Sequence, residues 1–165
     1  MFNFFKIDKA SLKEIIRNTA AKKDIDPAFI EKDMWVCFIL NYLFEICKYK
    51  SLFTFTGGTC LSKCYHVINR FSEDIDIAIK YDAIGQDDEV FGASTISQRD
   101  RIVKKIKSNT EHFLKNEFMK IMHHDLIEIL GNDYKFKLSY ENESIFFHYP
   151  MMFKDLYIDP RVKIE

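Results

Sequence analysis

The sequence predicts an α+β (α/β) fold in which helices flank a small mixed β-sheet. Three short stretches, at residues 53–56, 74–79 and 161–165, alternate apolar and polar side chains, as half-buried strands do. Longer stretches with helical periodicity lie before and between them. The chain has 165 residues, of which 47% are hydrophobic and 16 are Phe, so it suits a single domain with one core. We divide this domain into a helical amino-terminal part, 1–50, and a core, 51–165.

Two helices are expected in the amino-terminal part. The pattern Ser11-Leu-Lys-Glu14 is that of a capping box and predicts a first helix that ends near Lys23. Asp26 as the N-cap and Pro27 as the first helical residue predict the start of a second helix. This second helix is apolar nearly all round at residues 34–44, which indicates a buried central helix.

The stretch from residue 53 to residue 79 has the most distinctive pattern in the chain. Phe and Thr alternate at residues 53–56, and Gly57-Gly58 then ends the strand and permits a close approach of the backbone to another group. Thr59 is a good N-cap for a short helix that follows the glycines. Alternation resumes at residues 74–79, which predicts a second strand.

Asp74 and Asp76 are two residues apart on this second strand, so their side chains share a face, opposite Ile75, Ile77 and Ile79. Carboxylates at such neighbouring positions repel each other, which favours protonation of one of them or a cation between them. Mg²⁺ or Mn²⁺ is the expected cation because the ligands are carboxylates. The alternative is a surface strand with two solvated aspartates, although Asp is depleted in strands.

The glycine turn offers a second site close to the carboxylates. Backbone N–H groups and the positive end of a helix dipole suit a phosphate at Gly57-Gly58. A plain turn is the alternative. A phosphate site and a two-carboxylate metal site about one helix apart point to phosphoryl or nucleotidyl transfer.

The rest of the chain supplies a loop, a long helix, a hairpin and a last strand. Residues 80–94 are polar and are expected to form a solvated loop, with a mobile flap as the alternative. Residues 95–131 have a helical apolar stripe. Residues 134–138 and 145–149 predict a β-hairpin. On the last strand, 161–165, Val and Ile point inward and the charged residues share the opposite face.

The motifs of the core resemble those of a known superfamily. GGT at residues 57–59, a short helix and RFSEDID at residues 70–76 resemble the signature of polymerase-β-type nucleotidyltransferases. The fuller string GGTCLSK…RFSEDIDI resembles the AbiEii/AbiGii toxin family of bacterial toxin–antitoxin and abortive-infection systems. IEKDMW at residues 30–35 and VKIE at residues 162–165 are similar to that family as well.

The resemblance implies a nucleotidyltransferase-type fold and a Mg²⁺-dependent transfer of NMP from an NTP to an acceptor. It implies a cognate antitoxin as partner and tRNA as an expected RNA acceptor. GTP is a candidate substrate, although no residue indicates a choice of base. An inactive or truncated nucleotide-binding module of the same fold is the alternative function, and a purely structural or interaction domain is a third.

The resemblance also assigns residues to roles. An antiparallel strand beside Asp74 and Asp76 would present Glu165 as the third metal-binding and catalytic carboxylate. The expected nucleotide-binding residues are Gly57, Gly58, Thr59, Lys63, Arg70 and Ser72. A surface lysine is the alternative for Lys63, and a structural hydrogen bond is the first expectation for Ser72. Members of the family are usually longer, so truncation at the carboxyl end is open, and a terminal strand frays easily.

Glu31, Lys32 and Asp33 begin the apolar run of the second helix and have two interpretations. In one, they form a solvated first turn in which acidic residues favour the helix dipole. In the other, which the resemblance favours, they brace the active site from behind.

The composition bears on partners and compartment. The net charge of −1 leaves no general basic surface for nucleic acid, so an RNA contact requires a local patch. The four Cys lie in or near apolar helical segments, which is typical of a reducing compartment. There is no signal-peptide pattern, and the longest apolar run, 34–40, is too short for a membrane span. We therefore expect a cytoplasmic protein without a membrane partner.

Overall fold

The computed structural model describes residues 7–68, 71, 73–80 and 95–165. Within these residues a five-stranded sheet has the order β1-β2-β5-β4-β3. The strands are β1 (Phe53–Thr56), β2 (Asp74–Ile79), β3 (Lys137–Glu141), β4 (Ser144–His148) and β5 (Arg161–Ile164). β2 and β5 are parallel and the other neighbours are antiparallel, so the predicted mixed sheet with flanking helices is confirmed.

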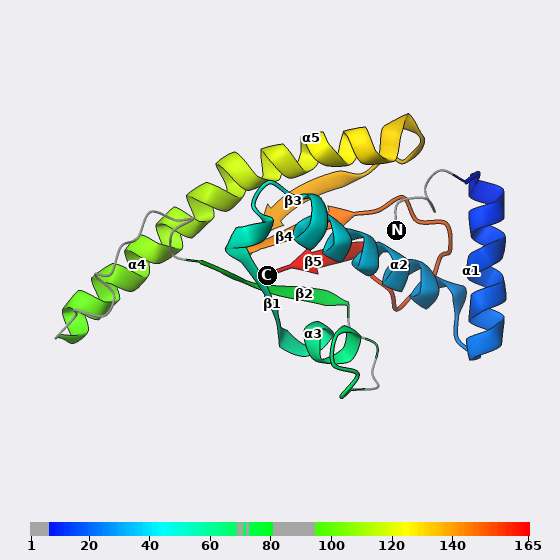
Figure 1. Cartoon of the computed structure of the whole chain (residues 1–165), viewed down its shortest axis with the longest axis horizontal. Coiled ribbons are helices and arrows are strands. Elements are labelled where there is room, and N and C mark those ends of the chain that lie inside the picture. Colours follow the sequence, from blue (N-terminus) through cyan, green and yellow to red (C-terminus); the bar gives the residue numbers. More distant parts are fainter. Residues whose placement is uncertain (1–6, 69–70, 72, 81–94) are drawn as a thin grey trace.

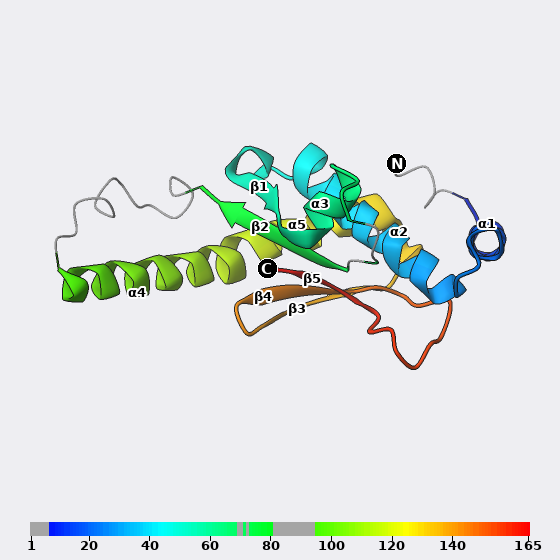
Figure 2. The ribbon, with the colours of Figure 1, turned by 90° about the horizontal axis from the view of Figure 1, so that it is seen from below.

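The helices gather on one side of this sheet. They are α1 (Lys9–Lys23), α2 (Pro27–Asn41), α3 (Gly57–Lys63), α4 (Ile96–Phe113) and α5 (Met119–Leu130), with π-helical turns at Tyr42–Ile46 and Leu114–Phe118 and 3₁₀ turns at Lys50–Leu52 and Gly131–Asp133. α4 extends away from the body of the molecule, and α1 lies at the opposite end (Figure 1). α2 and α5 lie on one side of the sheet, while among the described residues no helix covers the other side of β3, β4 and β5 (Figure 2).

The first helix begins earlier than the sequence predicted. Asp8 is its N-cap, and its carboxylate accepts hydrogen bonds from the Ser11 backbone N–H at 2.9 Å and the Ser11 hydroxyl at 2.6 Å. The predicted capping box at Ser11 is therefore wrong, because an aspartate three residues earlier already satisfies that N–H group. The predicted end at Lys23 is confirmed. Asp26 caps α2 through the N–H of Ala28 at 2.8 Å, as predicted.

α2 is the buried central helix that the sequence predicted. Trp35 and Phe38 have no exposed surface, and neither has Phe147 of β4 or Val162 of β5. The Trp35 and Phe147 rings lie 5.5 Å apart between centroids. Ile75 of β2 belongs to the same cluster, so α2 packs across the strands that hold the predicted site. Burial of rings of this size is the main source of stability in such a core.

β5 lies next to β2, but in the opposite direction to the one predicted. Asp74 is opposite Lys163, and Ile75 is opposite Ile164, in a parallel register. The Glu165 backbone continues this ladder: its N–H donates to the Ile75 carbonyl at 2.9 Å, and its carbonyl accepts from Ile77 N–H at 2.7 Å. The predicted antiparallel arrangement is wrong because alternation defines the faces of a strand and not its direction.

The remaining elements agree with the sequence patterns. The long helical stretch is confirmed and begins at a capping box formed by Thr95 and Gln98. The hairpin is confirmed as β3 and β4. Residues 81–94 of the expected loop lie outside the described residues. In the part of the chain that the structure describes, every helix is too short or too polar to span a lipid bilayer.

Candidate functional site

The carboxyl group of Asp76 lies directly against the backbone of Gly57. Thr56, the last residue of β1, is paired with Asp76 in the antiparallel register, and Gly57 follows with a φ of +71°. A Cβ atom at Gly57 would lie 1.7 Å from Asp76 Oδ2 and 2.3 Å from its Cγ. Glycine is therefore required at this position both by the backbone angle and by the space that Asp76 occupies.

Two threonine hydroxyls join the start of α3 to β2. Thr56 donates a hydrogen bond to the Asp76 carbonyl at 3.3 Å, and Thr59 donates to the Asp74 carbonyl. Thr59 is only 1% exposed, and Thr56 is the N-cap residue of α3. The predicted N-cap role of Thr59 is wrong because the helix begins at Gly57, directly after the strand. Thr59 instead links α3 to the first residue of β2.

Glu165 is the third acidic residue of this site. The parallel ladder places its backbone between Ile75 and Ile77, which is opposite Asp76. Burial, the charge of Glu165 and a hydrogen bond with it raise the pKa of Asp76. Burial is also the largest cause of the raised pKa of Asp74, and Glu165 adds to it, while Lys163 opposes it. The charge of Glu165 thus acts on both aspartates, while the predicted repulsion between Asp74 and Asp76 stays a prediction.

Lys163 supplies positive charge inside the same site. It lies two residues before Glu165 on the same face of β5, and its ammonium forms an ion pair with the Glu165 carboxylate. The charges of Asp74 and Asp76 contribute to a raised pKa of Lys163, after the larger effect of its hydrogen bond to Glu165. The sequence placed Lys163 on the correct face but did not indicate this contact.

The donor set of the site fits a hard divalent cation. Asp74, Asp76 and Glu165 offer carboxylate oxygens, which Mg²⁺ prefers, and their mutual repulsion favours a bound cation. In the described part of the chain, however, no three His, Cys, Asp or Glu side chains are gathered closely enough to hold a metal ion. The Lys163 ammonium balances the charge of Glu165 in this arrangement. Mg²⁺ binding therefore stays a prediction.

The predicted nucleotide-binding residues beyond the glycine turn are placed as follows. The Lys63 ammonium lies 2.5 Å from Asp33 Oδ1 and 3.4 Å from Cys37 Sγ of α2. Burial lowers the pKa of Lys63, but the hydrogen bond and the charge of Asp33 outweigh it and raise the pKa. Arg70 and Ser72 lie outside the described residues. Phosphate contacts of all three stay predictions.

The solvated interpretation of the start of α2 is wrong for Glu31 and Lys32. They are 1% and 2% exposed. The Glu31 carboxylate accepts hydrogen bonds from the backbone of the segment before β5, and Lys32 forms an ion pair with Glu73. Glu73, which lies just before β2, is thus held by the buried Lys32.

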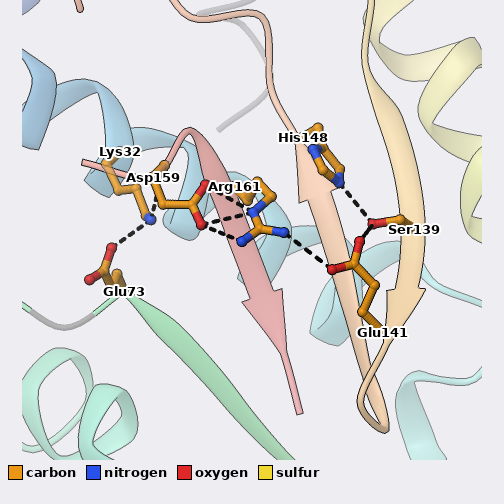
Figure 3. Close-up of polar contacts among 7 residues, drawn as sticks. All are labelled: Lys32, Glu73, Ser139, Glu141, His148, Asp159 and Arg161. Carbon is orange, nitrogen blue, oxygen red and sulfur yellow. Dashed lines mark hydrogen bonds and ion pairs between the residues drawn. The ribbon is translucent and has the colours of Figure 1, made fainter. Parts of the chain in front are cut away.

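A polar network that the sequence did not indicate lies across β5, β4 and β3 (Figure 3). Arg161 Nε donates hydrogen bonds to both oxygens of Asp159, at 2.9 and 2.8 Å, and the guanidinium reaches Glu141 at 3.5 Å. Ser139 contacts His148 Nε2 at 2.8 Å and donates to Glu141 at 2.9 Å. The predicted hairpin brings β3 and β4 together, but the sequence did not indicate that Arg161 of β5 lies beside them.

The comparisons with known proteins give one match. Residues 39–165 match the family described as "Nucleotidyl transferase AbiEii toxin, Type IV TA system". No curated protein and no solved structure matches the chain significantly. The matched part begins inside α2 and includes the glycine turn, β2 and Glu165. The IEKDMW motif at residues 30–35 precedes it.

Proposed function

The chain belongs to the AbiEii nucleotidyl transferase toxin family of type IV toxin–antitoxin systems, and from this premise we propose that it is a Mg²⁺-dependent transferase. It moves an NMP from an NTP to an acceptor hydroxyl. The observation that supports this proposal best is the contact between the Asp76 carboxyl and the backbone of Gly57, with Glu165 on the neighbouring strand. The proposed metal ligands, Asp76 and Glu165, thus lie next to the glycine turn that is the proposed triphosphate site.

Asp74, Asp76 and Glu165 are the proposed metal ligands. When bound there, a divalent ion would neutralise phosphate charge and lower the pKa of the attacking hydroxyl. The raised pKa values of Asp74 and Asp76, caused first by burial and further by the charge of Glu165, support this assignment, because a bound cation would offset both effects. Lys163 also supplies positive charge and would contact the anionic substrate from β5.

The first turn of α3 is the proposed triphosphate site. Gly57, Gly58 and Thr59 form the first turn of α3, where the backbone N–H groups of a helix suit a phosphate, and the Asp76 carboxyl lies against Gly57. Lys63 would exchange its Asp33 partner for a phosphate oxygen. Arg70 and Ser72 complete the set by family resemblance.

The acceptor, the base and the partner follow from the family rather than from the site. We propose RNA, with tRNA as the first candidate, as the resemblance to the family implies; Arg161 and Lys163, now paired with carboxylates, would contact an anionic acceptor on exchange of these partners. GTP is the first nucleotide to test, and a cognate antitoxin is the expected partner. The proposed setting is the cytoplasm.

A nucleotide-binding module without transfer activity is the second candidate. One observation favours it. Among the described residues, the three carboxylates are not gathered closely enough to hold a metal ion, and the Lys163 ammonium is paired with Glu165. This candidate binds NTP and transfers nothing.

Transfer of label tests the proposal. Each α-³²P NTP is incubated with Mg²⁺, total RNA and the wild type, the double variant Asp74→Ala/Asp76→Ala or the control Asp100→Ala, which removes an exposed aspartate of α4. We expect labelled RNA with the wild type and the control, and none with the double variant. Equal labelling by all three proteins rejects the assigned site, and NTP binding without any labelling favours the second candidate.

A further inference from the structure

We propose that Lys32 is a positioning residue that holds β2 and β5 in the register that brings Asp76 beside Glu165. The inference concerns the geometry of the site and rests on the proposed function for its importance in catalysis. Lys32 precedes the part of the chain that matches the family. It contacts neither the carboxyl group of Asp76 nor that of Glu165 in any interaction that the structure records.

The buried ammonium of Lys32 contacts residues that lie just before β2 and just before β5. Lys32 Nζ lies 2.5 Å from Glu73 Oε2 and donates a hydrogen bond to the Asp159 carbonyl at 2.7 Å (Figure 3). Glu73 immediately precedes β2, and Asp159 comes two residues before β5. The Lys32 side chain is only 3% exposed, so water cannot readily replace either partner.

The junction between β2 and β5 is short and decides the geometry of the site. Asp74 pairs with Lys163 and Ile75 with Ile164, and Glu165 adds the last two backbone hydrogen bonds. β1 and β2 lie on one side of this junction, and the other three strands lie on the opposite side. A slip of one residue would turn the Glu165 side chain away from Asp76, because successive side chains of a strand alternate between faces.

The two neighbours of Lys32 fix other segments of the same site. The Glu31 carboxylate accepts hydrogen bonds from the backbone N–H groups of Met152, at 2.7 Å, and Phe153, at 2.9 Å, in the connection between β4 and β5. Asp33 binds Lys63 at the end of α3, the helix that follows the glycine turn. Three consecutive residues of the buried helix α2 therefore hold β2, the approach to β5 and α3 in place.

The charge of Lys32 has a second effect, which the test must separate from positioning. Its positive charge lowers the pKa of Asp74, although burial of Asp74 has the larger, opposite effect. A purely electrostatic role predicts opposite results for the two ends of the ion pair: removal of the positive charge of Lys32 would strengthen cation binding, and neutralisation of Glu73 would weaken it. A positioning role predicts that both changes impair the site.

Hydrogen–deuterium exchange and kinetics of Lys32→Met and Glu73→Gln test the proposal. We expect exchange at residues 74–79 and 161–165 to increase at least about tenfold in both variants, with residues 137–148 unchanged, because only the junction loosens. Calorimetry should show weaker Mg²⁺ binding by both variants. The kcat of nucleotide transfer should fall on the order of 100-fold with little change in KM, as expected for misplaced catalytic groups. The control Lys115→Met removes the lysine of an exposed ion pair with Glu111 and should behave like the wild type.

Unchanged exchange at the junction in both variants would overturn the proposal, and so would an equal increase across the whole sheet. Stronger Mg²⁺ binding by Lys32→Met would overturn it in favour of the electrostatic role. If Lys32→Met does not fold, Glu73→Gln provides the test by hydrogen exchange at the junction, since the Glu73 side chain is 46% exposed and its replacement leaves no cavity. If the wild type transfers no nucleotide, the proposed function fails, while the exchange and calorimetry still decide whether Lys32 positions the two strands.

Discussion

The carboxylate of Asp76 occupies the space that a side chain at Gly57 would need: a Cβ atom there would lie 1.7 Å from Asp76 Oδ2. The strand that bears the acidic residues and the turn that begins α3 are therefore fitted to each other at this point. A glycine with positive φ and a carboxylate on the paired strand form one structural unit, and any side chain at the turn must displace the carboxylate.

Gly57→Ala is expected to abolish transfer and weaken Mg²⁺ binding because Asp76 must move. The positive φ adds a destabilisation of about 1–2 kcal/mol. Gly131→Ala is the matched control, since Gly131 also has a positive φ, of +64°, but nothing lies within 4 Å of its Cβ position. Denaturant unfolding and Mg²⁺ calorimetry should show that both variants lose stability and that only Gly57→Ala loses the cation. Wild-type Mg²⁺ affinity in Gly57→Ala would contradict this explanation.

Asp76→Asn is expected to change the pH dependence of stability in the absence of metal. The folded protein raises the pKa of Asp76, so its favourable contribution is complete below the ordinary pKa of aspartate and is lost as the pH rises through the raised value. Asparagine does not ionise. The free energy of unfolding of Asp76→Asn relative to the wild type should therefore increase from about pH 4 towards neutral pH. Urea unfolding in EDTA measures this difference, and a constant or falling difference would refute the raised pKa of Asp76, which burial and the charge of Glu165 cause.

Lys163→Met is expected to tighten Mg²⁺ binding. The ammonium of Lys163 sits at the Glu165 carboxylate and acts electrostatically on both aspartates, so it opposes a second cation in the same place. We expect a decrease in the Mg²⁺ dissociation constant on the order of threefold to tenfold. Lys163→Arg keeps the charge and should stay near the wild-type value. Weaker binding by Lys163→Met would show that Lys163 organises the carboxylates instead of competing with the cation.

Glu31→Gln is expected to destabilise the fold by about 1.5–3 kcal/mol, the usual value of hydrogen bonds to a charged group. Two backbone N–H groups donate to the buried Glu31 carboxylate, and an amide offers them only one oxygen. Glu14→Gln, at an exposed position of α1, is the control. Denaturant unfolding of the two variants compares them directly, and equal stabilities would mean that water replaces the lost contacts.

The central motif could be predicted because it follows rules that act over a few residues. Alternation along β2 placed Asp74 and Asp76 on one face, and two consecutive glycines indicated a close approach that the structure shows at Gly57. The family match over residues 39–165 agrees with the resemblance seen in these motifs.

The relationships that the sequence did not reveal involve residues that are distant in the chain. The residues alone left a solvated helix start open for Glu31 and Lys32, because their partners, Met152 and Asp159, are more than 100 residues away. The direction of β5 depends on how the connection after β4 returns to the sheet, and alternation does not record direction. The contact of Lys163 with Glu165 required the conformations of both side chains.

Comparison of α-³²P and γ-³²P labelled NTP tests the central claim most directly, with the wild type and Asp76→Asn assayed side by side in Mg²⁺ and RNA. The account predicts that the wild type places α-label on the acceptor and releases γ-label as pyrophosphate, and that Asp76→Asn does neither. Transfer of α-label by Asp76→Asn at the wild-type rate, or appearance of γ-label on the acceptor, would contradict nucleotidyl transfer at this site.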